Sequence, residues 1–368
     1  MNDSSEILAV ITIIPCYNEE DNISWTCSSL GFGINDAKQN LQHLLVLIDN
    51  NSTDSTLSVL QKIKTNSIEG TVYIHIEKEQ GYVPARHAGN EIARSIALSN
   101  GWNENSVLIL QADADTFYST GYIQEMARIS LDVGENVLVE ACVSYESKLI
   151  RKYRRYFDLC AEVDGRLLSR YKMDTGEEII VDDKVAGYRL SDYFFWGGHV
   201  REYFSNGNEV YAETTRLYLR AKTKGAKKVL AENAEAKHSM RKLIADTALH
   251  FATAGFPRED LFKERFKRLN LKIDINDIES SKQSSSYEIL AEFRLLHVIA
   301  LFIVLPLYIR HHDNINLSMN DPLEQFIISL LPAQSEEILF TPKVYFENIF
   351  NVIDRHGDLI LSKLEKHY

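Results

Sequence analysis

Apolar residues in the first half of the chain fall into short, continuous runs that are separated by longer stretches. The runs cover residues 8–14, 43–48 and 71–76, with a fourth that begins at Val107. Continuous runs of this length, rich in β-branched residues, are typical of strands that are buried on both faces. The stretches between them, such as residues 85–99, predict helices. This alternation predicts an α/β fold, related to the Rossmann fold, with a mostly parallel sheet and helices on both faces.

The second half of the chain follows a different pattern. A further strand is expected at residues 137–143, and a basic, amphipathic helix from Lys148 to about Tyr171. The charged face of this helix is expected to be solvated. The elements expected next are a loop or short hairpin at residues 174–191, a helix at about 212–224 and a short strand at 228–231. After about Ala245 the pattern is mostly helical, interrupted by a polar linker at residues 279–286.

Composition narrows the class of protein. The net charge of −12 argues against a nucleic-acid-binding protein, which usually has a basic surplus. The four cysteines, Cys16, Cys27, Cys142 and Cys160, have no paired metal-binding spacing and favour reduced thiols in a cytosolic protein. The first six residues are polar and acidic, unlike a secretory signal. We therefore expect a cytoplasmic protein.

One apolar segment, residues 295–309, raises the question of a membrane. The segment is shorter than the roughly 20 apolar residues that a spanning helix needs. It also contains His297 and Pro306. We therefore expect a buried helix, or one that rests on the inner face of a membrane without crossing it.

Two aspartates follow the strand that begins at Val107. Asp113 and Asp115 are separated by one small residue, so their side chains can point to the same side of an extended segment. Paired carboxylates on a loop suit a hard cation such as Mg²⁺ or Mn²⁺, whose shell is completed by water and substrate phosphates. The alternative is that the aspartates cap a helix that begins near Ser119.

Similar polar clusters follow the other predicted strands, where ligands of parallel sheets gather. The clusters are Pro15-Cys16-Tyr17-Asn18-Glu19-Glu20, Asp49-Asn50-Asn51-Ser52-Thr53-Asp54, Gly81 to Asn90, and Asp113-Ala114-Asp115. Downstream lie Trp196-Gly197-Gly198, Glu213-Thr214-Thr215-Arg216 and Lys237-His238. In this order and spacing the clusters resemble the family 2 glycosyltransferases, which have the nucleotide-sugar-binding GT-A fold.

The resemblance covers about residues 7–245. It implies a GT-A-like domain over residues 1–245, with a nucleotide-sugar half (7–144) and an acceptor half (145–245), followed by a helical region at 246–368. It also implies an inverting hexosyltransferase that moves one sugar from a nucleotide-sugar, expected to be a UDP-sugar, to a hydroxyl group. The acceptor would be a glycan, a glycolipid or a small molecule in bacterial glycan or glycolipid assembly, such as polysaccharide biosynthesis.

The resemblance assigns a nucleotide pocket to the first three clusters. Pro15, Tyr17 and Glu19 would line its wall, with Tyr17 near the base. Asp49 matches the aspartate that accepts a hydrogen bond from the N3–H of uracil, and Arg86 matches a basic residue near the base and diphosphate. The alternatives are an ordinary turn after the first strand, an Asx-turn at Asp49, and a surface position for Arg86.

The resemblance also implies a metal site. Asp113 would lie near the ribose, and Asp115 would hold Mg²⁺ or Mn²⁺ against the diphosphate. His238 falls where some members of the family supply a further ligand, although a lone histidine is more often structural. The cation would neutralise the charge of the departing nucleotide.

The sequence departs from the family where a general base is expected. Many members have an aspartate after Glu213, but this chain has Thr214, which accepts no proton at neutral pH. Glu213 is therefore the candidate base, with Glu209, one helical turn earlier, as the second candidate. Asp182 and Asp183 are more distant candidates. Processive synthases of the family carry a Gln-x-x-Arg-Trp motif, which this chain lacks. The absence of the motif favours transfer of a single sugar.

Two other functions compete with this one. A nucleotidyltransferase would have a glycine-rich, basic loop after the first strand, whereas residues 15–20 are acidic. A catalytically silent nucleotide-sugar-binding or scaffold protein remains an alternative, because Thr214 replaces the aspartate that usually acts as the base.

Overall fold

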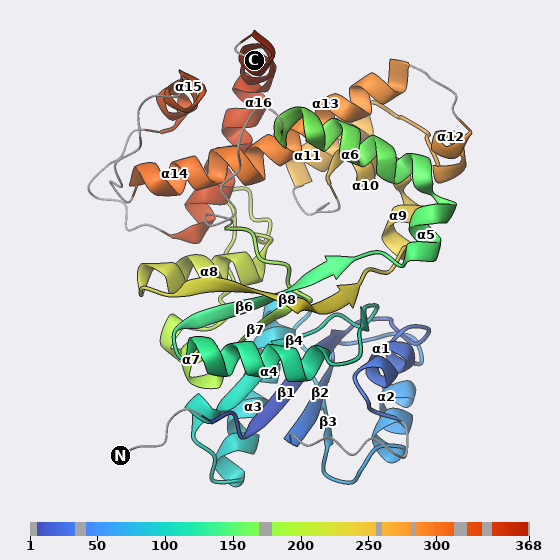
Figure 1. The fold of residues 1–368 in the computed structure, drawn as a ribbon, viewed down its shortest axis with the longest axis vertical. Helices are drawn as coiled ribbons and strands as arrows, with labels where there is room; N and C mark the ends of the chain where they lie inside the picture. Colours follow the sequence, from blue (N-terminus) through green and yellow to red (C-terminus); the bar gives the residue numbers. More distant parts are fainter. Residues whose placement is uncertain are drawn as a thin grey trace. The chain divides into compact units, whose positions relative to one another are not determined.

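The computed structural model describes residues 6–33, 42–168, 179–254, 260–280, 285–312, 322–332 and 341–366 of the chain. The chain divides into two compact units, and each unit is made of segments that are separate in the sequence (Figure 1). The first unit comprises Met1–Glu146, Val181–Arg201 and Ala212–Ser239, and the second comprises Ser147–Ile180, Glu202–Tyr211 and Met240–Tyr368. Strands β1 to β8 all belong to the first unit.

An eight-stranded sheet forms the centre of the first unit, and its strands follow the order β3-β2-β1-β4-β7-β6-β8-β5. The strands are β1 (Ala9–Cys16), β2 (Gln42–Asp49), β3 (Val72–Ile76), β4 (Val107–Gln111), β5 (Phe117–Tyr118), β6 (Val137–Ser144), β7 (Ala186–Arg189) and β8 (Lys227–Lys237). β1 is parallel to β2 and β4, β2 is parallel to β3, and β6 is parallel to β8. β7 is antiparallel to β4 and β6, and β5 to β8. The mostly parallel sheet is therefore confirmed.

Helices cover both faces of this sheet, as predicted. Successive strand residues point to opposite faces, and because the central strands are mostly apolar, each face presents apolar side chains to a layer of helices. The helices are α1 (Ile23–Ser29), α2 (Thr56–Thr65), α3 (Tyr82–Ser99), α4 (Tyr122–Val133), α7 (Leu190–Trp196) and α8 (Glu213–Thr223). On one face, Val10 and Leu108 share a buried core with α1, α2 and α4. On the other, Ile11 and Ile109 share a core with α3, α7 and α8.

The contact between α3 and β1 explains one residue of the third polar cluster. A Cβ atom on Gly89 would lie 2.3 Å from Cγ2 of Ile13, so only glycine lets the helix approach the strand this closely. This contact fixes the start of α3, and with it Arg86, against the sheet.

The second half of the sheet differs from the predictions in two places. Residues 174–191 were expected to form a loop or hairpin, but Ala186–Arg189 forms β7, which is buried between β4 and β6. A four-residue strand with a glycine carries little sequence signal. The strand expected at residues 228–231 begins at Lys227 and extends to Lys237, with buried alanines at 231, 234 and 236 among polar residues that are partly or fully exposed.

The second unit is built mainly from helices. They are α5 (Ser147–Lys152), α6 (Arg154–Leu168), α9 (Arg241–Ala245), α10 (Thr247–Ala252), α11 (Asp260–Arg268), α12 (Ile275–Glu279), α13 (Ser285–Ile299), α14 (Leu305–His312), α15 (Pro322–Leu330) and α16 (Pro342–Lys366). The basic helix predicted from Lys148 is interrupted at Tyr153, which is buried, and its predicted end at Tyr171 lies outside the described residues. Glu279 accepts hydrogen bonds from the backbone N–H groups of Arg155 and Tyr156, and so caps α6.

The apolar segment near residue 300 belongs to a helix that is longer than predicted. Ser286–His311 spans 26 residues and contains an 18-residue window with a mean hydropathy of 2.1, so by length and composition it could cross a membrane. However, 72% of its apolar window is buried within the protein, as in a core helix. A single mostly buried helix of this kind is weak evidence for a membrane span.

A π-helical turn, Ala300–Val304, lies inside this helix. Pro306 has no N–H group, and its ring would meet the carbonyl group of Phe302 in a regular α-helix. A π turn is one of the local changes that accommodate such a clash.

Candidate functional site

The loops that follow β1 and β2 are joined by hydrogen bonds. Asn18, with a φ of 54°, accepts a hydrogen bond from the N–H of Thr53 at 2.8 Å and donates its own N–H to Ser52 Oγ at 3.1 Å. The N–H of Glu19 donates to Thr56 Oγ1 at 2.8 Å. Much of the polarity in the first two clusters therefore stabilises the loops.

The residues predicted to line a nucleotide pocket lie at the end of β1. Pro15 is half-buried, Tyr17 is 49% exposed, and the Glu19 carboxylate accepts a hydrogen bond from Asn22 at 2.8 Å. The register of the parallel pair sets Cys16 level with Asp49, so Tyr17 lies just beyond the end of β2. The fold thus brings these residues to the edge of the sheet that also carries Asp49.

Asp49, the last residue of β2, is only 4% exposed. Its Oδ1 atom is buried and has no hydrogen-bond partner in the described part of the chain. The neighbouring Asn50 is fully used: Nδ2 donates to the carbonyl groups of Glu77 and Glu79, and Oδ1 accepts from the N–H of Gly81. Asn50 therefore holds the loop between β3 and α3, whereas Asp49 offers an acceptor to a ligand.

Asp113 and Asp115 lie on the loop between β4 and β5, and both are half-exposed. Thr26 Oγ1 donates to the carbonyl oxygen of Ala114 at 2.8 Å, and the N–H of Asp113 donates to Tyr118 Oη at 3.2 Å. These two contacts fix the loop from both sides. The helix-capping alternative is wrong, because α4 begins after Gly121 and has no side-chain cap.

Arg86 connects three segments of the first unit. The residue is 1% exposed, so the alternative of a surface position is wrong. Its Nη2 atom lies 2.9 Å from Asp113 Oδ1, and its Nε atom lies 3.3 Å from Glu213 Oε1. One buried guanidinium on α3 thus holds a carboxylate after β4 and another at the start of α8, and these charge-assisted bonds fix both carboxylates.

The candidate base and its neighbour occupy different environments. Glu213 is the first residue of α8 and is 3% exposed, with Arg86 as its partner. Thr214 is fully buried and exchanges hydrogen bonds with Gln111, at the end of β4, at 3.2 and 3.3 Å. The expected helical relation between Glu209 and Glu213 is wrong, because α8 begins at Glu213 and Glu209 forms a β-bridge with Tyr203 in the second unit.

His238 directly follows β8. Because Phe117 pairs with Lys237, the backbone of His238 lies beside the loop that carries Asp115. Its N–H donates to the carbonyl oxygen of Ser144 at 2.9 Å, and its ring stacks on Tyr145 with the centroids 4.9 Å apart. Within the described ranges, no group of three or more His, Cys, Asp or Glu side chains is arranged to hold a metal ion.

The donor set nevertheless fits Mg²⁺ or Mn²⁺. Magnesium in phosphate-binding sites uses one or two carboxylates, and substrate phosphates and water complete its shell. Asp113 and Asp115 carry carboxylate oxygens on a partly buried loop that follows β4. The Asp113 carboxylate is also held by Arg86, whose Nη2 atom lies 2.9 Å from Oδ1.

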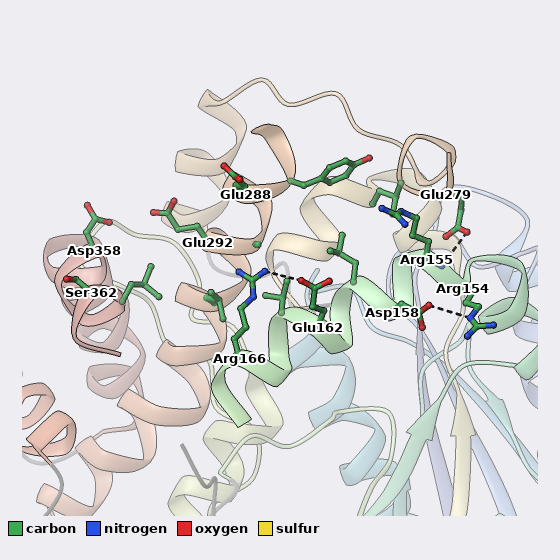
Figure 2. A pocket seen from close by; sticks show the side chains of 17 residues that line it. Arg154, Arg155, Asp158, Glu162, Arg166, Glu279, Glu288, Glu292, Asp358 and Ser362 are labelled. Atoms are coloured by element: carbon green, nitrogen blue, oxygen red, sulfur yellow. Dashed lines mark hydrogen bonds and ion pairs between the residues drawn. The ribbon is translucent and has the colours of Figure 1, made fainter. Parts of the chain in front are cut away.

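A separate cavity of about 1130 Å³ lies in the second unit, between α6, α12, α13 and α16 (Figure 2). Its charged side chains include Arg154 and Arg166, which pair with Asp158 and Glu162 on the same helix. Such i, i+4 pairs are common on exposed helix faces. The cavity contains none of the predicted site residues.

Sequence reasoning did not assign roles to several residues that shape the site. Asn50 and Gln111 could have been noticed, because each is a polar residue at the end of an apolar run. Nothing local marks Tyr118, whose hydroxyl supports Asp113 across the loop. His199, which follows two glycines, is 4% exposed and is considered below.

These features define a class of protein: an α/β protein with a carboxylate-rich polar site at the carboxyl ends of parallel strands. Residues 11–193 match the sequence model of the family described as "Glycosyl transferase family 2". The chain therefore carries, in residues 11–193, a domain of glycosyl transferase family 2, and this match supports a function in glycosyl transfer. No curated protein sequence gave a significant match.

Solved structures give weaker similarities. TarS residues 1–349 from S. aureus is 13% identical, with 87% of each chain covered and a TM-score of 0.43. Mannosyltransferase PcManGT from Pyrobaculum calidifontis, in complex with GDP-Man and Mn2+, is 13% identical, with 89% of this chain and 81% of that chain covered and a TM-score of 0.46. GalNAc-T7 with UDP, GalNAc and Mn2+ is 12% identical, with 81% of this chain and 58% of that chain covered and a TM-score of 0.43. The family assignment rests on the sequence match.

Proposed function

We propose that the protein is an inverting, metal-dependent hexosyltransferase that moves one sugar from a UDP-sugar to a hydroxyl group. The acceptor is a glycan, a glycolipid or a small molecule in bacterial glycan or glycolipid assembly, and the reaction takes place in the cytoplasm or at the inner face of the membrane. The proposal is supported by the family match to residues 11–193 and by the strand-end cluster of the first unit.

The observation that carries the proposal is the buried Oδ1 atom of Asp49, which has no partner in the described part of the chain. A buried acceptor that lacks a donor costs free energy, and a ligand N–H would remove that cost. Uracil presents such a donor at N3. Tyr17, half-exposed just beyond Asp49, supplies a ring for the base, and Pro15 and Glu19 complete this side of the pocket.

The metal would be held by Asp115, with Asp113 beside it and His238 as a further ligand. Bound there, Mg²⁺ or Mn²⁺ would neutralise charge on the diphosphate leaving group. Arg86 keeps Asp113 in place, so the chain itself fixes one wall of the diphosphate site.

Glu213 is proposed to act as the general base. The acceptor oxygen attacks the anomeric carbon on the side opposite the nucleotide, and its proton passes to the Glu213 carboxylate while the bond to the diphosphate oxygen breaks. Arg86 contacts Glu213 through one oxygen, Oε1, and orients the carboxylate.

Calorimetric titration of the full chain with UDP and GDP, each with and without Mn²⁺, tests this proposal. We expect metal-dependent binding and a preference for UDP. Asp49→Ala should reduce the affinity for UDP by about 1–3 kcal/mol, the cost of leaving a polar partner unpaired. Asp132→Ala, an exposed aspartate on α4, serves as the control. Equal binding of GDP and UDP by the wild-type chain contradicts the uracil assignment.

A second function, nucleotide-sugar binding without catalysis, is favoured by one observation. Thr214 stands where many members of the family have an aspartate, and its hydroxyl is fully buried and occupied by Gln111. Thr214 therefore takes no part in proton transfer. An assay of sugar transfer separates the two functions.

A further inference from the structure

A hydrogen-bonded chain in the first unit leads from the surface to a buried histidine. Helix α7 ends at Gly197, and the following turn returns the backbone so that the N–H of His199 donates to Tyr193 Oη at 2.9 Å. Nδ1 of His199 lies 3.2 Å from the same hydroxyl, and Nδ1 of His87 lies 2.9 Å from it. The Nε2 atom of His87 faces Glu91 at 3.8 Å.

The hydrogen positions on these side chains are assigned from their contacts, and we place a proton on Nε2 of His87, the nitrogen that faces Glu91. The Glu91 carboxylate favours a proton on Nε2 of His87, so Nδ1 of His87 accepts the hydrogen of the Tyr193 hydroxyl. The hydroxyl oxygen then has two lone pairs, which accept the N–H and the Nδ1–H of His199. Nε2 of His199 is therefore left with a lone pair.

Nε2 of His199 is buried and has no hydrogen-bond partner among the described residues. The residue as a whole is only 4% exposed. Burial and the positive charges of Arg86, Arg220 and Arg216 lower the pKa of His199 well below its usual value, while Asp183 opposes them. The imidazole is thus neutral at pH 7 and can accept a hydrogen bond. Buried acceptors of this kind are rare in folded proteins.

The position of His199 relates it to the proposed reaction. Arg86, whose charge acts on His199, also contacts Asp113 on the donor side and Glu213, the proposed base. The transferred sugar must lie between the leaving nucleotide and the base. We propose that His199 is a substrate-binding residue, whose Nε2 accepts a hydrogen bond from a hydroxyl group of the transferred sugar. This inference rests on the proposed function.

Two neighbouring side chains, those of Tyr193 and His87, support His199. Tyr193 and His87 act as positioning residues, since they hold His199 in the tautomer that can accept a hydroxyl. In the ligand-free chain Nε2 is enclosed, so the sugar must displace part of its surroundings when it binds. A purely structural His199 would need only its two bonds to Tyr193.

Two substitutions separate these roles. In His199→Asn the amide reaches only as far as Nδ1, so the bond to Tyr193 is kept and the Nε2 acceptor is lost. In His199→Gln the amide oxygen reaches the position of Nε2, and the bond from Nδ1 is lost. Tyr193→Phe removes the hydroxyl that sets the tautomer. His356→Asn, on α16 of the second unit, is the matched control.

The measurement is the affinity for UDP-glucose, UDP-galactose and UDP-N-acetylglucosamine relative to that for UDP, with Mn²⁺ present. For the preferred sugar, His199→Asn should reduce this ratio about tenfold, the usual weight of one hydrogen bond, and leave binding of UDP itself unchanged. His199→Gln should keep most of the ratio, and Tyr193→Phe should give an intermediate loss. A wild-type ratio in His199→Asn, with the thermal midpoint unchanged, overturns the assignment. A wild-type chain that binds none of these nucleotides instead overturns the proposed function, and the assignment with it.

Discussion

Each unit contains a nearly buried arginine, and the two arginines are used differently. In the second unit, Arg294 forms a bidentate pair with Asp164, with both distances 2.7 Å, and donates to the carbonyl oxygen of Phe251 at 2.9 Å. In the first unit, Arg86 makes single contacts with two carboxylates, Asp113 and Glu213, from separate segments. The Arg294 guanidinium thus contacts one carboxylate through two bonds, whereas the Arg86 guanidinium contacts two carboxylates.

This difference separates a charge that supports the fold from charges that are arranged for a ligand. The pair between Arg294 and Asp164 joins α13 to α6 and has the geometry of a structural ion pair. The cluster around Arg86 gathers carboxylates from separate segments at the end of the sheet that also carries Asp49 and Asp115. Charged groups gathered in this way are typical of functional sites.

The largest effect is expected from Glu213→Gln, which removes basicity but keeps the shape. Turnover should fall about 10²–10⁴-fold, the usual contribution of a general base, with the affinity for UDP nearly unchanged. Glu162→Gln, on α6 of the second unit, should leave turnover at the wild-type level. Wild-type turnover in Glu213→Gln would move the base assignment to Glu209 or Asp183.

Arg294→Ala should affect stability and leave the site intact. The substitution removes the charge-assisted hydrogen bonds from Asp164, a partly exposed carboxylate, at a cost of about 1–3 kcal/mol. All three tryptophans, Trp25, Trp102 and Trp196, lie in the first unit, so their fluorescence follows that unit, whereas circular dichroism follows both. Urea unfolding should show an earlier loss of helical signal, with UDP affinity unchanged. A loss of UDP affinity as large as that of Asp49→Ala contradicts the structural role.

The two units should share a sensitivity to acid. Burial lowers the pKa of His43 in the first unit to about 3, and burial together with Arg294 lowers the pKa of His297 in the second to about 3. Between the ordinary value of 6.5 and about 3, the unfolded chain binds more protons than the folded chain. The stability from each histidine is therefore present above pH 6.5 and is lost as the pH falls toward 3.

Each histidine should contribute a slope of at most about 1.4 kcal/mol per pH unit in this range. Unfolding by urea at several pH values between 7 and 4 measures the slope. In His43→Gln the tryptophan-detected slope should decrease, whereas His297→Gln should flatten mainly the dichroism-detected slope. Identical slopes in the wild-type chain and in His43→Gln would show that His43 titrates normally in the folded state.

The smallest effect is expected from Thr214→Val. Valine keeps the shape of threonine but leaves the buried Gln111 amide without its partner, at a cost of about 1–2 kcal/mol. Turnover per folded molecule should not change. Thr223→Val, an exposed position on the same helix, is the control for thermal unfolding. A loss of turnover larger than the loss of folded protein would give Thr214 a direct role.

The fold and the location of the site could be predicted from local sequence signals. Buried strands of a parallel sheet are continuous apolar runs, and their carboxyl ends lie at one end of the sheet, so Asp49 and Asp113 were predicted to lie at the same end. β7 was missed because Ala186–Arg189 is short and owes its conformation to pairing with β4 and β6.

The contacts between side chains from distant segments could not be predicted. The pairing of Arg86 with Glu213 joins residues 127 positions apart and depends on how α3 and α8 pack on the sheet. The bond between Gln111 and Thr214 has the same origin. The placement of Glu209 on the same helix face as Glu213 was wrong, because Glu209 precedes the helix, whose start was predicted at about residue 212 and lies at Glu213.

The most direct test of the central claim is the release of UDP from UDP-sugars by the full chain. The wild-type chain, incubated with UDP-glucose, UDP-galactose and UDP-N-acetylglucosamine and with glycerol or methyl glycosides as hydroxyl acceptors, should release UDP from at least one donor. The release should require Mn²⁺ or Mg²⁺ and should fall about 10²–10⁴-fold in Glu213→Gln. Metal-dependent binding of UDP with no release from any donor would contradict catalysis and identify the protein as a nucleotide-sugar-binding protein.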